Sequence, residues 1–118
     1  MTHSIKWLAE PEEHDFPAAF DCISMEYGEE QAAVLVEKLR AAEITHRKAK
    51  DIVRMSRDTP HDAKNKHVKH NLDKIAAREP LSPVLLVSGK PLLVADGWHR
   101  VSAIHLLDED ALIPCKIV

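Results

Sequence analysis

The spacing of apolar residues predicts two helices in the first part of the chain. Gly28 separates them, and Glu29 and Glu30 open the second helix with carboxylates that complement the helix dipole. The apolar face of the first helix repeats every three or four positions and comprises Phe16, Phe20, Ile23 and Tyr27. The buried face predicted for the second comprises Ala32, Leu35, Val36 and Leu39. We expect a helical hairpin within residues 1–44 whose role is packing, with Trp7 packed on it.

The segment from residue 45 to 78 has a looser pattern. Residues 48–55 fit either a short strand or a helical turn, because their periodicity favours neither. Proline and turn-forming residues predict a loop at 57–62. A helix is predicted over about 67–78, and Pro80 is expected to end it. Its predicted inward residues are Val68, Leu72, Ile75 and Ala76.

The last third of the chain shows the clearest pattern. Apolar runs at 84–87 and 92–95 flank a turn rich in glycine and proline, which is typical of a β-hairpin. A tight turn leads into a helix over about 98–107, and a final strand is predicted over 113–118. The stripe of this helix comprises Trp98, Val101, Ile104 and Leu107. The predicted fold class is therefore α+β, a small mixed sheet with helices, preceded by the helical hairpin.

Length and composition favour one domain. The chain has 118 residues, 45% of them hydrophobic and 30% charged, which suffices for a core and a charged surface. We divide it into an N-terminal helical extension at 1–44 and a core over 45–118. Its start lacks the apolar segment of a signal peptide, and no apolar run approaches the ~20 residues of a membrane span. Two cysteines, Cys22 and Cys115, suit a reducing compartment, so we expect a cytoplasmic protein without a membrane partner.

Charge is distributed unevenly along the chain. The formal net charge is −3, but residues 1–44 carry −7, residues 45–78 carry +6 and residues 79–118 carry −2. A basic middle segment would suit the phosphates of a nucleotide or a nucleic acid. The alternative is a solvated basic face that balances the acidic N-terminal segment, and charge alone leaves both open. The basic segment also holds His46, His61, His67 and His70.

The turn from Asp96 to Arg100 has the composition of an anion-binding site. Gly97 lies between a strand and a helix, where the first backbone N–H groups of the helix have no internal partner. The positive end of the helix dipole lies there, and a glycine lets an anion approach the backbone. Arg100 can fork two hydrogen bonds onto phosphate, and His99 adds a donor that titrates near neutral pH. Two other arrangements stay open: both side chains face solvent, or they pair with Asp96.

The last third also resembles a known superfamily. Residues 97–103 (GWHRVSA), followed by 113–118 (IPCKIV), are similar to the C-terminal half of the ParB/sulfiredoxin superfamily. Sulfiredoxins carry Gly-Cys-His-Arg at this turn, and ParB-type proteins carry Gly-Glu-Arg-Arg. The similarity covers roughly residues 48–118 and leaves the helices of 1–44 outside the shared core. In length and layout the chain looks like a small stand-alone protein of this superfamily.

The resemblance implies a nucleotide site at the same turn. In relatives this turn binds nucleotide phosphates: ATP in sulfiredoxin, CTP in chromosome-partitioning ParB and ADP in a related free-serine kinase. The implied ligand is therefore a nucleotide of the ATP, ADP or CTP class, with Mg²⁺ as a companion ion. Carried over by position, the phosphate- or nucleotide-binding residues are Gly97, Trp98, His99 and Arg100. The helix before the hairpin adds His67, His70 and Lys74, and the basic residue near the first strand is Lys50 or Arg54.

Two departures from the superfamily narrow the expected function. Trp98 stands where sulfiredoxin needs its nucleophilic cysteine, so we do not expect sulfiredoxin activity. Without a helix-turn-helix after the last strand, specific operator binding would need another element, although the basic segment could hold DNA through phosphates. We expect Trp98 to pack in the core rather than stack on a base. We expect Cys115 to be a core or edge thiol.

Catalytic candidates are few. If a phosphoryl group moves, Asp51 and Asp96 are the candidates for a general base or a Mg²⁺ contact, as in a phosphotransferase or hydrolase. Their competing roles are an ion pair of Asp51 with Arg54 and a helix cap by Asp96. His61, His67 and His70 are a weak metal motif, because no HExxH or cysteine pair accompanies them.

The function expected from the sequence is nucleotide or phosphate binding at the 96–100 turn, and whether that ligand is turned over stays open. The alternative is a ParB-like DNA-binding, nuclease-like or protein-interaction module without catalysis.

Overall fold

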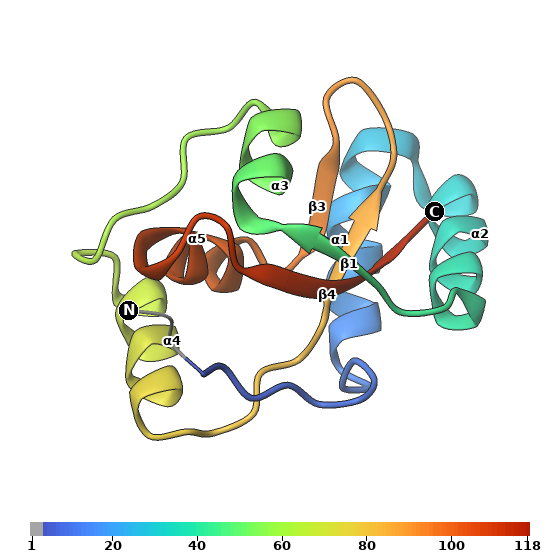
Figure 1. The fold of residues 1–118 in the computed structure, drawn as a ribbon. Coiled ribbons are helices and arrows are strands. Elements are labelled where there is room, and N and C mark those ends of the chain that lie inside the picture. Colours follow the sequence, from blue (N-terminus) through green and yellow to red (C-terminus); the bar gives the residue numbers. More distant parts are fainter. Residues whose placement is uncertain (1–3) are drawn as a thin grey trace.

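The computed structural model describes residues 4–118 and contains five helices and four strands there (Figure 1). None of these helices combines the length and the apolar character that a membrane crossing requires. The predicted α+β fold class is confirmed. In chain order the elements are α1 (Asp15–Tyr27), α2 (Glu29–Ala41), β1 (Thr45–Lys48), α3 (Ala49–Ser56), α4 (Lys66–Ala76), β2 (Val84–Val87), β3 (Leu93–Asp96), α5 (Trp98–Leu107) and β4 (Leu112–Ile117).

The four strands form one mixed sheet in the order β1-β4-β2-β3. β1 pairs antiparallel with β4, β2 pairs antiparallel with β3, and β2 and β4 are parallel neighbours. Parallel neighbours need a crossover connection, and β3 with α5 supplies the one between β2 and β4. This topology places the start of α5 directly at the end of β3, so a single turn at Gly97 joins them.

The sheet separates two hydrophobic cores, and β2 contributes to both. Val84 and Leu86 face the core formed with α3, α4 and α5, whereas Leu85 and Val87 face the core formed with α1 and α2. Figure 1 shows these two groups of helices on opposite sides of the sheet. A strand buried on both faces reads as a continuous apolar run, which is why Val84–Val87 has no polar alternation.

The predicted helical hairpin is confirmed as α1 and α2. Gly28 joins them with a φ of 83°, in the left-handed range that favours glycine. Phe16 and Ile23 are buried as predicted, whereas Tyr27 at the end of α1 is 44% exposed. The hairpin packs on β2 and β3, so α1 and α2 cover one face of the sheet rather than extending from it.

In the middle of the chain, residues 49–55 adopt the helical alternative as part of α3, and only Lys48 of the ambiguous segment belongs to a strand, β1. The helix predicted over about 67–78 differs in two details. α4 ends at Ala76, and two residues later Arg78 adopts a left-handed φ of 61°. The helix therefore ends before it reaches Pro80, which was predicted to end it. Ala76 is exposed rather than inward, since it lies in the last turn after the buried Ile75.

The expectation that Trp7 packs on the helical hairpin is wrong. Trp7 packs against the opposite core, the one that contains α3, α4 and α5. The physical reason is a backbone pairing with the segment before β2. Leu8 N donates to Leu81 O at 2.8 Å, and Leu81 N donates to Lys6 O at 2.9 Å. This short parallel bridge holds Trp7 on that side of the sheet.

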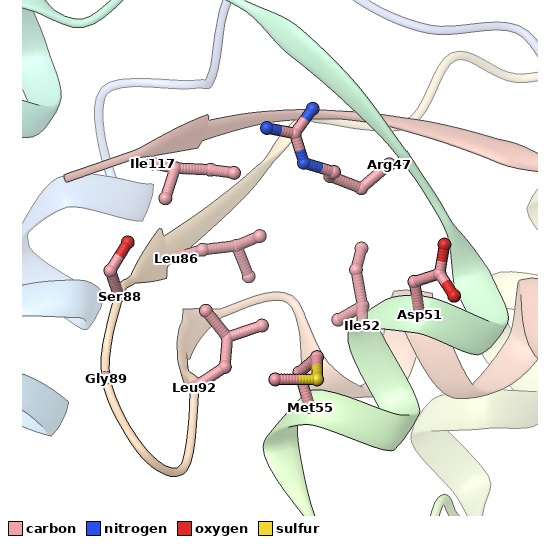
Figure 2. Close-up of a pocket in the computed structure, with 9 residues that line it drawn as sticks. All are labelled: Arg47, Asp51, Ile52, Met55, Leu86, Ser88, Gly89, Leu92 and Ile117. Atoms are coloured by element: carbon pink, nitrogen blue, oxygen red, sulfur yellow. The ribbon is translucent and has the colours of Figure 1, made fainter.

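A cavity of about 310 Å³ opens between α3 and the loop that joins β2 to β3 (Figure 2). Its walls come from β1, α3, β2, the β2–β3 loop and β4. The lining residues are Arg47, Asp51, Ile52, Met55, Leu86, Ser88, Gly89, Leu92 and Ile117.

Candidate functional site

Gly97 sets the start of α5. Its φ of 108° lies in the left-handed region, which residues with a Cβ rarely adopt. A Cβ at this position would lie 2.5 Å from Val84 Cγ1 and 2.9 Å from Arg100 Nη2. Backbone conformation and packing against β2 therefore both require glycine here, in addition to the room for an anion that the sequence suggests.

The first turn of α5 has no side-chain cap. The intrahelical bonds begin with Val101 N donating to Gly97 O at 2.9 Å, which leaves the amides of the three preceding residues outside the ladder. Asp96 is therefore not a helix cap. α4 shows the contrast, because the side chain of its N-cap Asn65 accepts from the amides of His67 and Val68.

Arg100 turns back onto the end of β3. Its Nη2 donates to Asp96 Oδ2 at 2.9 Å, and both side chains are more than four-fifths buried. The alternative in which Arg100 pairs with Asp96 is thus the one observed. Burial raises the pKa of Asp96, and the Arg100 charge only partly opposes this effect. Arg100 Nε is buried and has no hydrogen-bond partner within residues 4–118.

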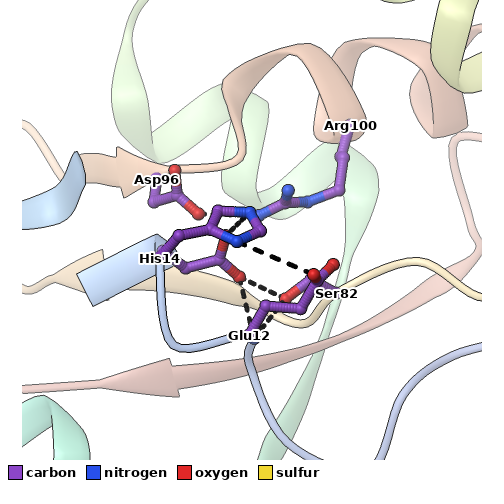
Figure 3. Close-up of polar contacts among 6 residues, drawn as sticks. Glu12, His14, Ser82, Asp96 and Arg100 are labelled. Atoms are coloured by element: carbon purple, nitrogen blue, oxygen red, sulfur yellow. Dashed lines mark hydrogen bonds and ion pairs between the residues drawn. The ribbon is translucent and has the colours of Figure 1, made fainter. Parts of the chain in front are cut away.

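A buried polar network lies next to this pair (Figure 3). Asp15 is 2% exposed, and its carboxylate accepts a hydrogen bond from the hydroxyl of Ser82. Glu12 N donates to both Asp15 Oδ2 and Ser82 Oγ, at 3.1 Å each. His14 Nε2 lies 3.3 Å from Asp15 Oδ1. These hydrogen bonds connect the start of α1 to the segment before β2. No sequence pattern distinguishes the buried Asp15 from an exposed aspartate in a first helical turn.

Three histidines meet beside the first turn of α5. The rings of His99 and His61 stack with centroids 5.0 Å apart and an angle of 11° between their planes. The ring of His67, at the start of α4, lies 4.8 Å from His99 at 48°. Burial lowers the pKa of His99, and the nearby charges of His67 and His61 lower it further. We call His61, His67 and His99 the histidine cluster.

The loop that carries His61 is held against α5. His61 N donates to Ser102 Oγ at 3.2 Å, and Ser102 is fully buried on α5. This bond fixes the loop so that its imidazole faces His99. The sequence groups His61 with His67 and His70 but does not place it beside His99, because only the tertiary fold brings residue 61 to residue 99.

The other predicted phosphate ligands are dispersed. His70 and Lys74 follow His67 on α4, one and about two turns further along the helix. Lys50 pairs with Asp110 at 2.6 Å, which raises the pKa of the lysine and lowers that of the aspartate. Arg54 is exposed on α3 and forms no ion pair within residues 4–118.

Asp51, Trp98 and Cys115 were also the subject of predictions from the sequence. Asp51 does not pair with Arg54; it lines the cavity between α3 and the β2–β3 loop. Trp98 packs against the core as expected. Cys115 is a core thiol on β4, and burial raises its pKa to about 11, so it is not a reactive thiolate at neutral pH.

The basic segment 45–78 does not pair with the acidic residues of 1–44 within the described part of the chain. Its ion pairs are those of Lys48 and Lys50 with Asp110, which lies in the loop before β4. Eight of its ten basic side chains are exposed. The solvated basic face is therefore the arrangement observed, but it forms no ion pairs with the acidic residues of 4–44, which pair with Arg40 and Lys116 instead.

Neither the arrangement of metal-ligating side chains nor the comparison with known proteins identifies a ligand for this site. Within residues 4–118 no three His, Cys, Asp or Glu side chains are arranged to hold a metal ion. No family model, curated protein or solved structure matches the chain. The resemblance to the ParB/sulfiredoxin superfamily therefore stays a prediction.

Proposed function

We propose that this chain binds a phosphate-bearing ligand of the nucleotide class at the amino end of α5. The observation that carries the proposal is the histidine cluster, which gathers His61, His67 and His99 beside a helix start without a side-chain cap. Uncapped amides and imidazolium groups are both hydrogen-bond donors to phosphate oxygens. Their combination favours an anion over a neutral ligand.

Electrostatics support the same ligand. In the free protein, His99 is harder to protonate than usual because it is partly buried and has two basic neighbours. A bound phosphate would reverse this effect, since a nearby negative charge favours the protonated imidazole. Ligand binding and proton uptake should therefore be coupled in this site.

Arg100 is a second potential hydrogen-bond donor to a phosphate. Its guanidinium contacts Asp96, and its Nε faces no protein acceptor in the described residues. Removing the charge of Asp96 would leave the guanidinium free to turn toward a phosphate. Arg100→Ala should weaken nucleotide binding by about 1.5–3 kcal/mol, the range for a hydrogen bond to a charged group.

We also propose that the chain belongs to the ParB/sulfiredoxin superfamily. The support is the order strand, strand, helix, strand over residues 84–118, with α5 beginning one residue after Gly97. A continuous helix through residues 92–95 would have contradicted the assignment, and this segment is a loop residue followed by β3.

The test is a thermal-shift screen of ATP, ADP, CTP and GTP, each with and without Mg²⁺. At least one nucleotide should raise the melting temperature of the wild-type chain. The rise should be lost in His99→Gln and kept in His105→Gln, which changes a histidine near the far end of the same helix. Equal responses of the two variants, or no response of the wild type, would refute the site.

A second pair of variants tests the role of Arg100. Asp96→Asn should tighten nucleotide binding if the released guanidinium reaches the phosphates, whereas Arg100→Ala should weaken it. Isothermal titration of both folded variants gives the comparison. Unchanged affinity in both would remove Arg100 from the site and leave the histidine cluster alone.

Nucleic acid is a second candidate ligand, favoured by the eight exposed basic side chains of 45–78. Duplex binding through them would weaken with salt, with a slope near −0.9 in log–log form for each phosphate contacted. We rank it below the nucleotide because the net charge is −3. A paired titration with a fluorescent duplex and a fluorescent nucleotide at two salt concentrations decides, and tight, salt-steep duplex binding alone would reverse the ranking.

A further inference from the structure

The cavity beside α3 has the size and the walls of a small-molecule site (Figure 2). Its volume of about 310 Å³ is at the lower end of the ~300–1,000 Å³ that is usual for ligand pockets. Leu86 and Ile52 form a floor that is almost fully buried. Met55, Leu92 and Ile117 complete the apolar walls. A compact apolar group is the natural occupant of such a hollow.

Two opposite charges border this apolar hollow without neutralising each other. Arg47 and Asp51 both line the cavity, yet they do not form an ion pair. Arg47 uses one nitrogen, Nη1, to donate to Thr45 Oγ1 at 3.1 Å and to His46 O at 3.0 Å. Neither acceptor is a carboxylate, so the positive charge is not balanced there.

The neighbouring lysines show that this arrangement is not forced by a lack of partners. Asp110 forms ion pairs with Lys50 at 2.6 Å and with Lys48 at 3.9 Å. Both lysines lie between Arg47 and Asp51 in the sequence. Asp51 has no ion pair within residues 4–118. The cavity rim thus keeps one cation and one anion available to a ligand.

The walls of the cavity are fixed before any ligand arrives. Leu92 N donates to Met55 O at 2.9 Å, which ties the β2–β3 loop to α3. Ser88 N donates to Val118 O at 2.7 Å, which ties the other end of that loop to the chain after β4. A site held open by such bonds costs little reorganisation on binding.

This cavity is separate from the amino end of α5. Leu92 lies just before β3 and Gly97 just after it, so the four residues of β3 separate the two places. At about 3.3 Å per residue, this strand spans roughly 13 Å. A ligand in the cavity and a phosphate at the histidine cluster would therefore be different molecules or distant parts of one.

We propose that the cavity binds a free α-amino acid with an apolar side chain. The carboxylate would face Arg47, the ammonium group would face Asp51, and the side chain would lie on Leu86 and Ile117. A guanidinium is well suited to a carboxylate because its N–H groups form a fork that matches the two oxygens. The proposal does not depend on the nucleotide site.

The experiment is isothermal titration with three probes that share one apolar body: L-leucine, L-leucinamide and 4-methylpentanoate. Leucinamide lacks the carboxylate and 4-methylpentanoate lacks the ammonium group. Wild-type protein should bind leucine at least about tenfold more tightly than either, the scale of one lost charge-assisted hydrogen bond. Other apolar amino acids, including L-valine and L-phenylalanine, complete the panel.

Variants assign each charge to its group. Arg47→Gln should weaken leucine binding about tenfold or more and leave leucinamide nearly unchanged. Asp51→Asn should weaken leucine and leave 4-methylpentanoate nearly unchanged. Lys38→Gln on α2 and Asp21→Asn on α1 are matched charge controls away from the cavity and should bind leucine like the wild type.

A filling variant keeps the proposal falsifiable if the charge variants are ambiguous. Met55 is 48% exposed, so Met55→Trp should fold and should abolish leucine binding by occupying the cavity. Absence of saturable binding of every apolar amino acid up to about 10 mM, ten times a millimolar Kd, would overturn the proposal. Equal binding of leucine and 4-methylpentanoate, with no effect of Asp51→Asn, would also overturn it in favour of a simple organic anion.

Discussion

The amino ends of α2 and α5 both follow a glycine but carry opposite charge. Each helix is preceded by a glycine with positive φ, Gly28 or Gly97, and neither glycine can offer a capping side chain. The first turn of α2 contains Glu29 and Glu30, whereas that of α5 contains His99 and an inward-turned Arg100. Carboxylates satisfy the positive end of a helix dipole, and basic groups oppose it.

This difference shows which helix start is complete without a ligand. α2 supplies its own negative charge and faces solvent around Gly28, where a Cβ would have no neighbour within 4 Å. α5 has its basic residues at the same position, its Gly97 packed against Val84, and two further histidines beside it. An external anion would satisfy the positive end of the α5 dipole, as Glu29 and Glu30 satisfy that of α2.

The largest expected effect is on stability at the two glycines. Both Gly97→Ala and Gly28→Ala place a Cβ at positive φ, at a cost of about 1–3 kcal/mol each. Gly97→Ala also forces a clash with Val84, which adds about 1–3 kcal/mol as overpacking. Urea unfolding of both variants should therefore show a clearly larger loss at Gly97. Equal losses would mean that the close packing of the β3–α5 turn is not rigid.

A charge reversal at α5 sharpens the comparison by making α5 resemble α2. His99→Glu should abolish the nucleotide-dependent rise in melting temperature, because the new carboxylate takes the place of the phosphate. The same variant should gain about 0.3–1 kcal/mol from the helix dipole in the absence of ligand. His99→Gln should lose the nucleotide response without that gain. A nucleotide response that survives in His99→Glu would contradict the proposed anion site.

Acidification should lower the stability of the folded chain through His99 at the start of α5. The pKa of His99 in the folded chain is below its ordinary value of 6.5, so the unfolded chain binds the proton more readily. The stability linked to this group is thus complete above pH 6.5 and is lost as the pH falls toward the folded-state pKa. Thermal unfolding between pH 8 and pH 5 should show a smaller loss for His99→Gln than for the wild type or His105→Gln.

The same linkage predicts the pH dependence of ligand binding. Because a phosphate favours the protonated imidazole, nucleotide affinity should rise as the pH falls below about 6.5. Titrations in buffers of different ionisation enthalpy should reveal proton uptake on binding. An affinity that is independent of pH in this range would separate His99 from the ligand.

The smallest effect concerns α2. Glu29→Gln should cost about 0.3–1 kcal/mol, the usual value of a carboxylate in a first turn, and the cost should shrink in high salt. Glu43→Gln, beyond the end of α2, is the control and should change stability less. Urea unfolding at low and high salt measures both, and a salt-independent loss at Glu29 would argue against a dipole effect.

The local structure was largely predictable because it depends on periodicity and on turn chemistry. The stripe through Val101 and Ile104 marked α5, and the apolar run of β2 marked a strand buried on both faces. The candidate turn at Gly97 was also visible, because glycine followed by His99 and Arg100 is unusual chemistry for a first helical turn. Such signals lie within about ten residues of one another, so no knowledge of long-range contacts is needed.

The tertiary structure decided which of these residues act together. It turned Arg100 onto Asp96, brought His61 and His67 to His99, and placed Asp51 in a cavity with Arg47 rather than beside Arg54. The sequence by itself determined the α+β class, the turn that ends β3 and most of the elements, but it left β1 and α3 open. Contacts between distant residues depend on how the elements pack, and a helix can rotate to bury one neighbour or another at similar cost. Packing therefore determined which charges are paired and which remain available to a ligand.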